Sequence, residues 1–127
     1  MQHKPYKTAH PEIIASVTKD GSIIRELMHP STHKAKKQSL AEAIIPRNQS
    51  TKPHRHVTSE EIYHVLAGSG TMKIEGNNFP IQEGDSICIA PGETHNVTNT
   101  GLPDLVILCC CSPPYSHDDT EIIGEKS

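Results

Sequence analysis

The sequence of 127 residues lacks tryptophan and has few aromatic side chains, which make up 3 % of the chain. Its core must therefore be built from isoleucine, valine and leucine, which occur here in short runs that favour β-strands. The length suits one domain, which can bury a core without help from disulfides or a structural metal.

Long apolar runs are also missing. No stretch approaches the ~20 apolar residues that a membrane-spanning helix needs. Residues 1–10 are polar and have no hydrophobic signal-peptide segment. We therefore expect a cytoplasmic protein without a membrane partner.

Basic residues are not in excess, since 12 Lys and Arg stand against 15 Asp and Glu, for a formal net charge of -3. Nucleic-acid-binding domains usually carry a basic face, so we expect no nucleic-acid partner. Separated cysteine pairs are absent too, because three of the four cysteines are consecutive. On a strand, Cys109 and Cys111 would face one side and Cys110 the other, which favours small core residues over a metal cage.

The sequence contains short apolar segments separated by turn residues. Its apolar residues do not recur at the spacing of an amphipathic helix. Regular short strands separated by turns predict an all-β sandwich or barrel. Gly76, Asn77 and Asn78 predict a hairpin turn, since Gly and Asn tolerate positive φ. The expected strands are residues 22–27, 39–45, 61–66, 71–75, 86–89, 95–99 and 105–111.

Three histidines and one glutamate are the candidates for chemistry. His54 and His56 are two positions apart, so on a strand both would project to the same side. Glu61 begins the next apolar run, and His95 begins a later one. Three imidazole nitrogens and one carboxylate oxygen suit one divalent ion such as Fe, Mn, Ni, Zn, Co or Cu.

The spacing of these residues closely resembles the two motifs of the cupin family. The first motif is Gly-x5-His-x-His-x3-4-Glu-x6-Gly, and it selects Glu61 over Glu60 by register to the closing glycine. Asn replaces its opening glycine, at little cost because Asn also tolerates positive φ. The residues matching the first motif are Asn48, His54, His56, Glu61 and Gly68.

The second cupin motif is Gly-x5-Pro-x-Gly-x2-His-x3-Asn. Here Ala90 occupies the usual proline position, and the proline follows at Pro91. The residues matching the motif are Gly84, Gly92, His95 and Asn99. The resemblance implies a double-stranded β-helix, or jelly-roll barrel, in which the three histidines and Glu61 are the metal ligands.

The resemblance also implies the organisation and function of the chain. We expect an N-terminal arm and first strand in residues 1–36, a barrel in residues 37–112 and a tail in residues 113–127. We expect a homodimer and a small metalloenzyme of the isomerase, lyase or epimerase type, acting on a small oxygenated metabolite such as a sugar, sugar acid or oxo-acid. A metal-dependent dioxygenase and a non-catalytic small-molecule binding module remain alternatives, because one fold hosts many activities.

Three further residues are candidates for contact with a ligand. Tyr63 shares the alternation phase of Glu61, so its hydroxyl would meet either a ligand or a core partner. The tail resembles the C-terminal stretch of some small bacterial cupins. Our hypothesis is that Pro113-Pro114 turns the tail over the barrel mouth and offers Tyr115 or His117 to the site. The alternative is a tail that packs on a partner subunit or is disordered.

Overall fold

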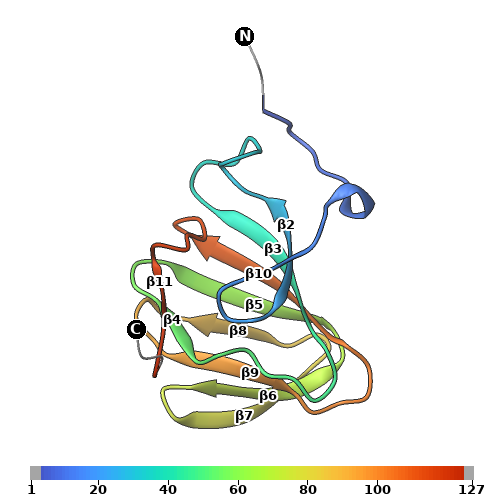
Figure 1. The fold of residues 1–127 in the computed structure, drawn as a ribbon, viewed down its shortest axis with the longest axis vertical. Coiled ribbons are helices and arrows are strands. Elements are labelled where there is room, and N and C mark those ends of the chain that lie inside the picture. Colours follow the sequence, from blue (N-terminus) through green and yellow to red (C-terminus); the bar gives the residue numbers. More distant parts are fainter. Residues whose placement is uncertain (1–3, 125–127) are drawn as a thin grey trace.

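Residues 4–124 are described by a computed structural model, in which two antiparallel β-sheets pack face to face (Figure 1). The six-stranded sheet has the order β1 (Ser16–Val17), β2 (Ile23–Met28), β3 (Ser39–Ile45), β10 (Leu105–Ser112), β5 (Glu60–Ala67) and β8 (Ser86–Ile89). The five-stranded sheet has the order β11 (Thr120–Ile122), β4 (His54–His56), β9 (His95–Asn99), β6 (Ser69–Ile74) and β7 (Asn77–Gln82). A short 3-10 turn, η1 (His10–Glu12), precedes β1. The architecture confirms the predicted all-β jelly roll.

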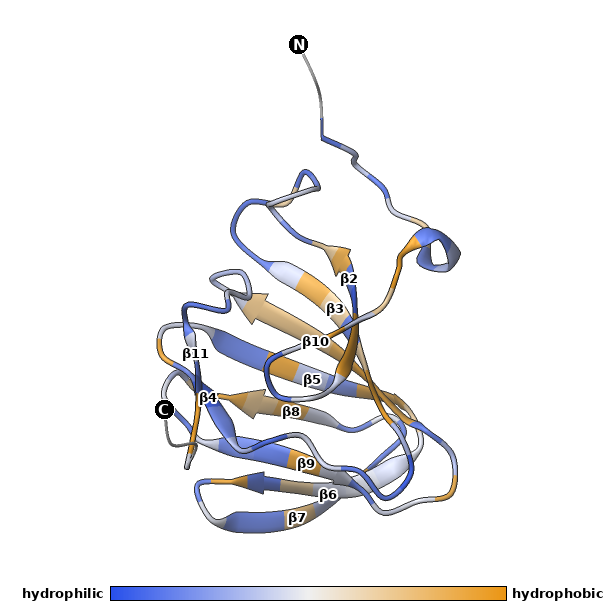
Figure 2. Ribbon diagram, in the orientation of Figure 1, coloured by the Kyte–Doolittle hydropathy of each residue, from blue (hydrophilic) through white to orange (hydrophobic). Residues whose placement is uncertain are grey.

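Side chains alternate along the strands between the space inside the sandwich and its outer surface. Buried and part-buried residues alternate along all of β3 and along β10 as far as Cys111. Figure 2 shows apolar stretches in β2, β3 and β10, so the six-stranded sheet supplies much of the apolar interior. Cys109 and Cys111 are buried and Cys110 is part-exposed, as the alternation predicted.

Two positions of the first motif have a positive φ. Asn48 has a φ of 63°, which confirms that it substitutes for the glycine of the first motif. Gly68 has a φ of 86°, and a Cβ there would lie 2.7 Å from the carbonyl oxygen of Asp104. A side chain at position 68 would therefore be strained by the backbone and would also clash with it.

The turn of the β6–β7 hairpin begins one position earlier than the sequence predicted and is one residue shorter. Glu75 and Gly76 both have positive φ, at 49° and 82°, and they form the two-residue turn. Asn77 and Asn78 belong to β7, where they pair with Ile74 and Lys73. The prediction placed Asn77 and Asn78 in the turn because Gly and Asn tolerate positive φ, but the pairing of the two strands sets the register.

A short strand near each end of the described residues joins the edge of a sheet. β1 pairs with β2 at the edge of one sheet, and β11 pairs with β4 at the edge of the other, placing Thr120 opposite His56. Figure 1 shows β11 beside β4, while the N-terminal arm extends away from the sheets. The sequence did not predict β1 or β11, which are two and three residues long. Among residues 4–124, no helix has the length and apolarity needed to cross a membrane.

Candidate metal centre

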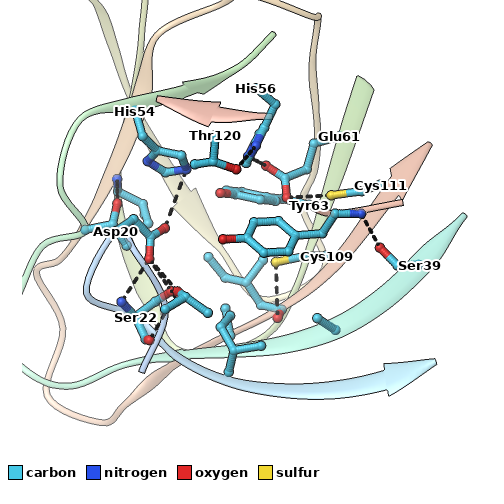
Figure 3. Close-up of a pocket in the computed structure, with 18 of the residues that line it drawn as sticks. Asp20, Ser22, Ser39, His54, His56, Glu61, Tyr63, Cys109, Cys111 and Thr120 are labelled. Atoms are coloured by element: carbon cyan, nitrogen blue, oxygen red, sulfur yellow. Dashed lines mark hydrogen bonds and ion pairs between the residues drawn. The ribbon is translucent and has the colours of Figure 1, made fainter. Parts of the chain in front are cut away.

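Both sheets contribute to one cluster of metal-ligating side chains. β4 supplies His54 and His56, β9 supplies His95, and β5 in the opposite sheet supplies Glu61. His54 and His95 are directly opposite each other in the antiparallel β4–β9 pair. Each of the four residues is at most 5 % exposed. Figure 3 shows His54, His56 and Glu61 pointing toward a common centre.

The ligand atoms of the cluster converge. One nitrogen from each imidazole and one oxygen of Glu61 lie within 4.8 Å of one another. The Nε2 atoms of His56 and His95 are 3.2 Å and 3.4 Å from Glu61 Oε1. Yet the buried Glu61 Oε1 and His95 Nε2 have no hydrogen-bond partner among the described residues. Buried polar atoms are rarely left unpaired, so these two atoms fit a cation placed between them.

Backbone carbonyls determine the tautomers of two histidines. His54 Nδ1 donates to the carbonyl of Lys52 at 2.8 Å, and His95 Nδ1 donates to the carbonyl of Glu93 at 2.9 Å. A carbonyl can only accept, so the proton of each neutral ring is on Nδ1. The Nε2 lone pairs of both rings are therefore available to a metal.

The C-terminal strand holds His56 in the same tautomer. Thr120 Oγ1 donates its proton to the carbonyl of Ser116 at 2.8 Å. It must therefore accept the hydrogen bond from His56 Nδ1, which is 3.0 Å away. His56 Nε2 is consequently also free to bind a metal.

A cysteine orients the carboxylate. Cys111 lies directly opposite Glu61 in the β10–β5 pair, and its Sγ donates to Glu61 Oε2 at 3.1 Å. Burial raises the pKa of the Cys111 thiol, and the adjacent Glu61 charge raises it further. The thiol therefore keeps its proton and remains a donor to Glu61.

Burial and mutual contact shift the pKa values within the cluster. Burial lowers the pKa of His54, and the neighbouring His95 adds to this effect. Burial also opposes charge on His56 and Glu61, but their contact outweighs it, so the pKa of His56 is raised and that of Glu61 is lowered. Glu61 is therefore a carboxylate at neutral pH.

A cavity of about 50 Å³ adjoins the cluster. One water molecule needs about 10–15 Å³ of such space, so the cavity has room for a few waters or a small ligand. Alanine, isoleucine and cysteine side chains of the six-stranded sheet line much of it. The polar lining residues outside the metal cluster are Thr18, Asp20, Ser22, Glu26, Ser39, Thr51, Tyr63, Tyr115 and Thr120.

The three tyrosine and histidine candidates differ in position. Tyr63 lines the cavity, with its ring centroid 6.0 Å from that of His95, and burial raises its pKa well above the usual value. Tyr115 also lines the cavity, with its ring 5.8 Å from that of His56, and burial raises its pKa to about 12. Both phenols are therefore protonated at neutral pH.

His117 lies farther out. Its Nδ1 shares a hydrogen bond with the Tyr115 hydroxyl at 3.2 Å. It lines a second and more open pocket of about 380 Å³, which we call the outer pocket, and does not line the cavity. Tyr115 lines both spaces. Of the two tail candidates, Tyr115 is thus at the site and His117 contacts it through Tyr115.

Sequence reasoning missed several polar groups at the site. Asp20 Oδ2 is 3.5 Å from His54 Nε2, but Asp20 was not among the candidates selected from the sequence. Glu26 has a buried Oε1 without a hydrogen-bond partner in the described part of the chain, and burial raises its pKa despite the opposing effect of His29. Alternation groups Ile24 with Glu26, but it does not show which face is inside. The positions of Cys111 and Thr120 at the site depend on the pairing of strands that are distant in the sequence.

The chemistry of the four ligand atoms determines which metal ion suits the site. Three imidazole nitrogens and one carboxylate oxygen suit mid-row divalent ions better than Ca²⁺, which prefers oxygen ligands. Hydrogen bonds to the far side of each ring and to the carboxylate are typical of ligands oriented for a metal. An ion that prefers more than four ligands would keep at least one coordination position for water or substrate when the protein supplies four.

Known proteins are similar to this chain in sequence. The sequence matches the Cupin domain family over residues 41–111. It is 52 % identical over 120 residues to an uncharacterized protein of Methanocaldococcus jannaschii, covering 94 % of this chain and 96 % of the relative. It is also 34 % identical over 84 residues to an oxalate-binding protein of Thermotoga maritima, covering 66 % of this chain and 65 % of that protein.

Solved structures agree with the family match. A predicted oxalate decarboxylase from Thermotoga maritima superposes with a TM-score of 0.73 and 26 % identity, covering 83 % of this chain and 96 % of that one. The polyketide cyclase RemF from Streptomyces resistomycificus shares the fold with a TM-score of 0.79 and 20 % identity, covering 95 % of this chain and 87 % of that one. The sequence match over more than half of the chain, together with the fold, shows that the protein belongs to the cupin family.

Proposed function

We propose that the chain binds one divalent metal ion through His54, His56, Glu61 and His95 and acts as an enzyme on a small oxygenated metabolite. The observation that carries this proposal is the pair of buried atoms without hydrogen-bond partners in residues 4–124, Glu61 Oε1 and His95 Nε2. A cation between them would satisfy both atoms. Isomerase, lyase or epimerase chemistry on a sugar, sugar acid or oxo-acid is the reaction class that we propose.

A bound metal of this kind polarises a carbonyl or acidifies a hydroxyl. The protein's own groups would then position the ligand and move its protons. The Tyr63 hydroxyl keeps its proton and can donate a hydrogen bond within the cavity. Asp20 and Glu26 provide acceptors, and the Tyr115 ring lies between the cavity and the outer pocket, where it limits access of water.

The similarity to the Thermotoga proteins supports a small ligand rich in oxygen. One is described as oxalate-binding and the other as a predicted oxalate decarboxylase. Their descriptions include both binding and catalysis, so they do not by themselves favour an enzyme. The cavity lining supports a reaction, because Tyr63, Tyr115, Asp20 and Glu26 line the cavity that adjoins the candidate metal site.

Metal analysis tests the first half of the proposal. Protein purified without added metal, and the same protein after incubation with Fe, Mn, Ni, Zn, Co or Cu, should contain about one ion per chain by elemental analysis. His95→Ala should abolish retention, whereas His64→Ala should not, because His64 bonds to Ser86 on the outer face. Protein that takes up none of these metals would contradict the proposal.

Turnover assays test the second half. Conversion of a candidate sugar, sugar acid or oxo-acid without oxygen consumption supports isomerase or lyase chemistry. Oxygen uptake that depends on the candidate substrate would instead identify a dioxygenase. A ligand that co-purifies in the cavity and is retained without turnover would identify a binding module.

We also propose a homodimer formed through the outer face of the six-stranded sheet. Ile62 and Leu66 on β5 are 44 % and 41 % exposed on this face, and the neighbouring β10 adds Leu108, which lies opposite His64 between these two positions. A two-fold axis would place this apolar strip against its own copy. Light scattering should report a dimer, and Ile62→Asp should dissociate it. A monomeric wild-type protein would contradict this part of the proposal.

A further inference from the structure

We infer that the cavity selects an uncharged ligand that donates hydrogen bonds, such as a short hydroxyketone or polyol, over a dicarboxylate such as oxalate. This inference rests on the proposed metal site and narrows the class of its ligand. The observation behind it is the charge of the cavity lining. The lining has three carboxyl groups, on Asp20, Glu26 and Glu61, and no lysine or arginine.

The cationic neighbours of these carboxyl groups are directed elsewhere. Lys19 precedes Asp20, but its Nζ donates to the carbonyls of His117 and Thr120, at 3.1 Å and 2.7 Å. Arg25 precedes Glu26, but it bonds to Glu42 at 3.0 Å across the β2–β3 pair. Neither side chain lines the cavity, so neither can pair with an anion bound there.

Charge balance then disfavours a dianion. Histidines bind a metal as neutral ligands, so a divalent ion held by the three rings would be balanced by the carboxylates of Glu61 and Asp20. A dicarboxylate would add two negative charges to a buried site without a cation to pair with them. Burying unpaired charge is costly. A neutral ligand avoids this cost.

Asp20 is placed as an acceptor for such a ligand. Its Oδ1 accepts three hydrogen bonds, from the Thr18 hydroxyl at 2.9 Å, the Ser22 amide at 2.9 Å and the Ser22 hydroxyl at 2.6 Å. These bonds fix the carboxyl group, and its Oδ2 lies beside the metal cluster, 3.5 Å from His54 Nε2. Figure 3 shows Asp20 below His54, with Ser22 on its far side.

Glu26 provides a second acceptor. Its side chain lines both the cavity and the outer pocket, and its buried Oε1 has no hydrogen-bond partner within residues 4–124. A ligand hydroxyl would satisfy this oxygen, whereas a ligand carboxylate would repel it. Both carboxyl groups can therefore accept hydrogen bonds from a ligand that has several hydroxyl groups.

Two probes of equal size test the inference. Oxalate and dihydroxyacetone have the same number of non-hydrogen atoms, but the first is a dianion and the second a neutral hydroxyketone. The full-length protein is loaded with Co²⁺, and each probe is titrated while the visible cobalt absorption is recorded. Metal content is measured after each titration, because oxalate is itself a chelator. We expect dihydroxyacetone to bind at least about tenfold more tightly than oxalate.

Two variants test whether Asp20 and Glu26 accept hydrogen bonds from the ligand. Asp20→Asn and Glu26→Gln keep the shape of each side chain and remove its charge. Each should lower the affinity for dihydroxyacetone about tenfold, since hydrogen bonds to charged groups are stronger than neutral ones, and should raise the affinity for oxalate. Glu83→Gln makes the same change at an exposed site outside the cavity and should leave both affinities unchanged.

The outcomes separate this inference from the proposed function. Protein that takes up no Co²⁺ overturns both. Protein that binds Co²⁺ but prefers oxalate overturns the inference and leaves the metal site standing. Loss of Co²⁺ from Asp20→Asn would make Asp20 a metal ligand instead of an acceptor for substrate, and would also overturn the inference. Variants that bind both probes like the wild type would overturn the roles of Asp20 and Glu26.

Discussion

His56 Nδ1 lies 3.0 Å from Thr120 Oγ1, so a residue of the C-terminal strand fixes the orientation of a candidate metal ligand on β4. Asp119, the residue before Thr120, accepts hydrogen bonds from the amides of Thr58 and Ser59, at 2.9 Å and 3.1 Å, and from the Thr58 hydroxyl. These contacts hold β11 against the segment that joins β4 to β5. The tail is thereby part of the site.

We predict that Thr120→Val weakens metal binding about 10–100-fold, the usual effect of losing such a partner. Valine keeps the shape of threonine but cannot accept the hydrogen bond from His56 Nδ1. Thr120→Ser is the matched control, because it keeps the hydroxyl and should retain most of the affinity. Metal affinity is measured by competition with a chelator. Equal affinities for the Val and Ser variants would show that the hydroxyl plays no part.

A second prediction concerns Cys111, which donates to Glu61 Oε2 at 3.1 Å. Cys111→Val removes the donor but fills the space, leaving a buried carboxylate oxygen unpaired. This should cost about 1–3 kcal/mol in the free energy of unfolding of the metal-free protein. Cys111→Ser keeps a donor and should lose less. Chemical denaturation in the presence of a chelator gives both values, and a Ser variant as unstable as the Val variant would contradict the role of the donor.

The two residues behind these predictions also show the limit of sequence reasoning. His54, His56, Glu61 and His95 could be selected because strand alternation and motif spacing are local patterns along the chain. Cys111 was expected to face inward, but its position opposite Glu61 depends on the register of β10 with β5. Thr120 lies in a polar tail with no strand pattern, and β11 exists because it pairs with β4, which is distant in the sequence.

The N-terminal segment illustrates the same limit in another way. The strand at 22–27 was predicted and β2 spans Ile23–Met28, so its existence and approximate bounds could be found from apolar content. Alternation could not show which face points inward, because all six of its residues are part-buried. The inward position of Glu26 is therefore a property of the packed sheets and not of the local sequence.

A third prediction follows from Glu26, whose pKa burial raises above the ordinary value of 4.5. The folded protein then binds this proton more tightly than the unfolded chain does. Stability contributed by Glu26 is present below the unfolded pKa and is lost as the pH rises through the higher folded pKa. Glu26→Gln should therefore be more stable than the wild type at pH 7 and equally stable below about pH 4.5.

Thermal unfolding of the metal-free proteins across this pH range measures the difference. Glu83→Gln is the control, because Glu83 is exposed and the variant should follow the wild type at every pH. A Glu26→Gln variant that is less stable than the wild type at pH 7 would contradict the prediction. The expected gain would mean that Glu26 costs stability, as groups retained for function often do.

A fourth prediction concerns removal of the metal. An ion that binds the folded state alone stabilises it by about 2.7 kcal/mol when its free concentration is 100 times its Kd. For a chain of this size, a chelator should then lower the Tm by roughly 10 °C. His95→Ala should show no such effect of the chelator, because the stabilising ion is already lost. A wild-type Tm that does not respond to metal or chelator would contradict the metal site.

The last prediction concerns Tyr115, whose ring lines both the cavity and the outer pocket and lies 5.8 Å from the ring of His56. Tyr115→Ala should open the cavity toward the outer pocket, so a chelator should remove the metal several-fold faster. Tyr115→Phe keeps the ring but loses the hydrogen bond to His117, and it should release metal at the wild-type rate. Stopped-flow mixing with a coloured chelator measures the three rates. An unchanged rate in the Ala variant would show that the ring does not limit access, and faster release from the Phe variant would assign the effect to the hydroxyl.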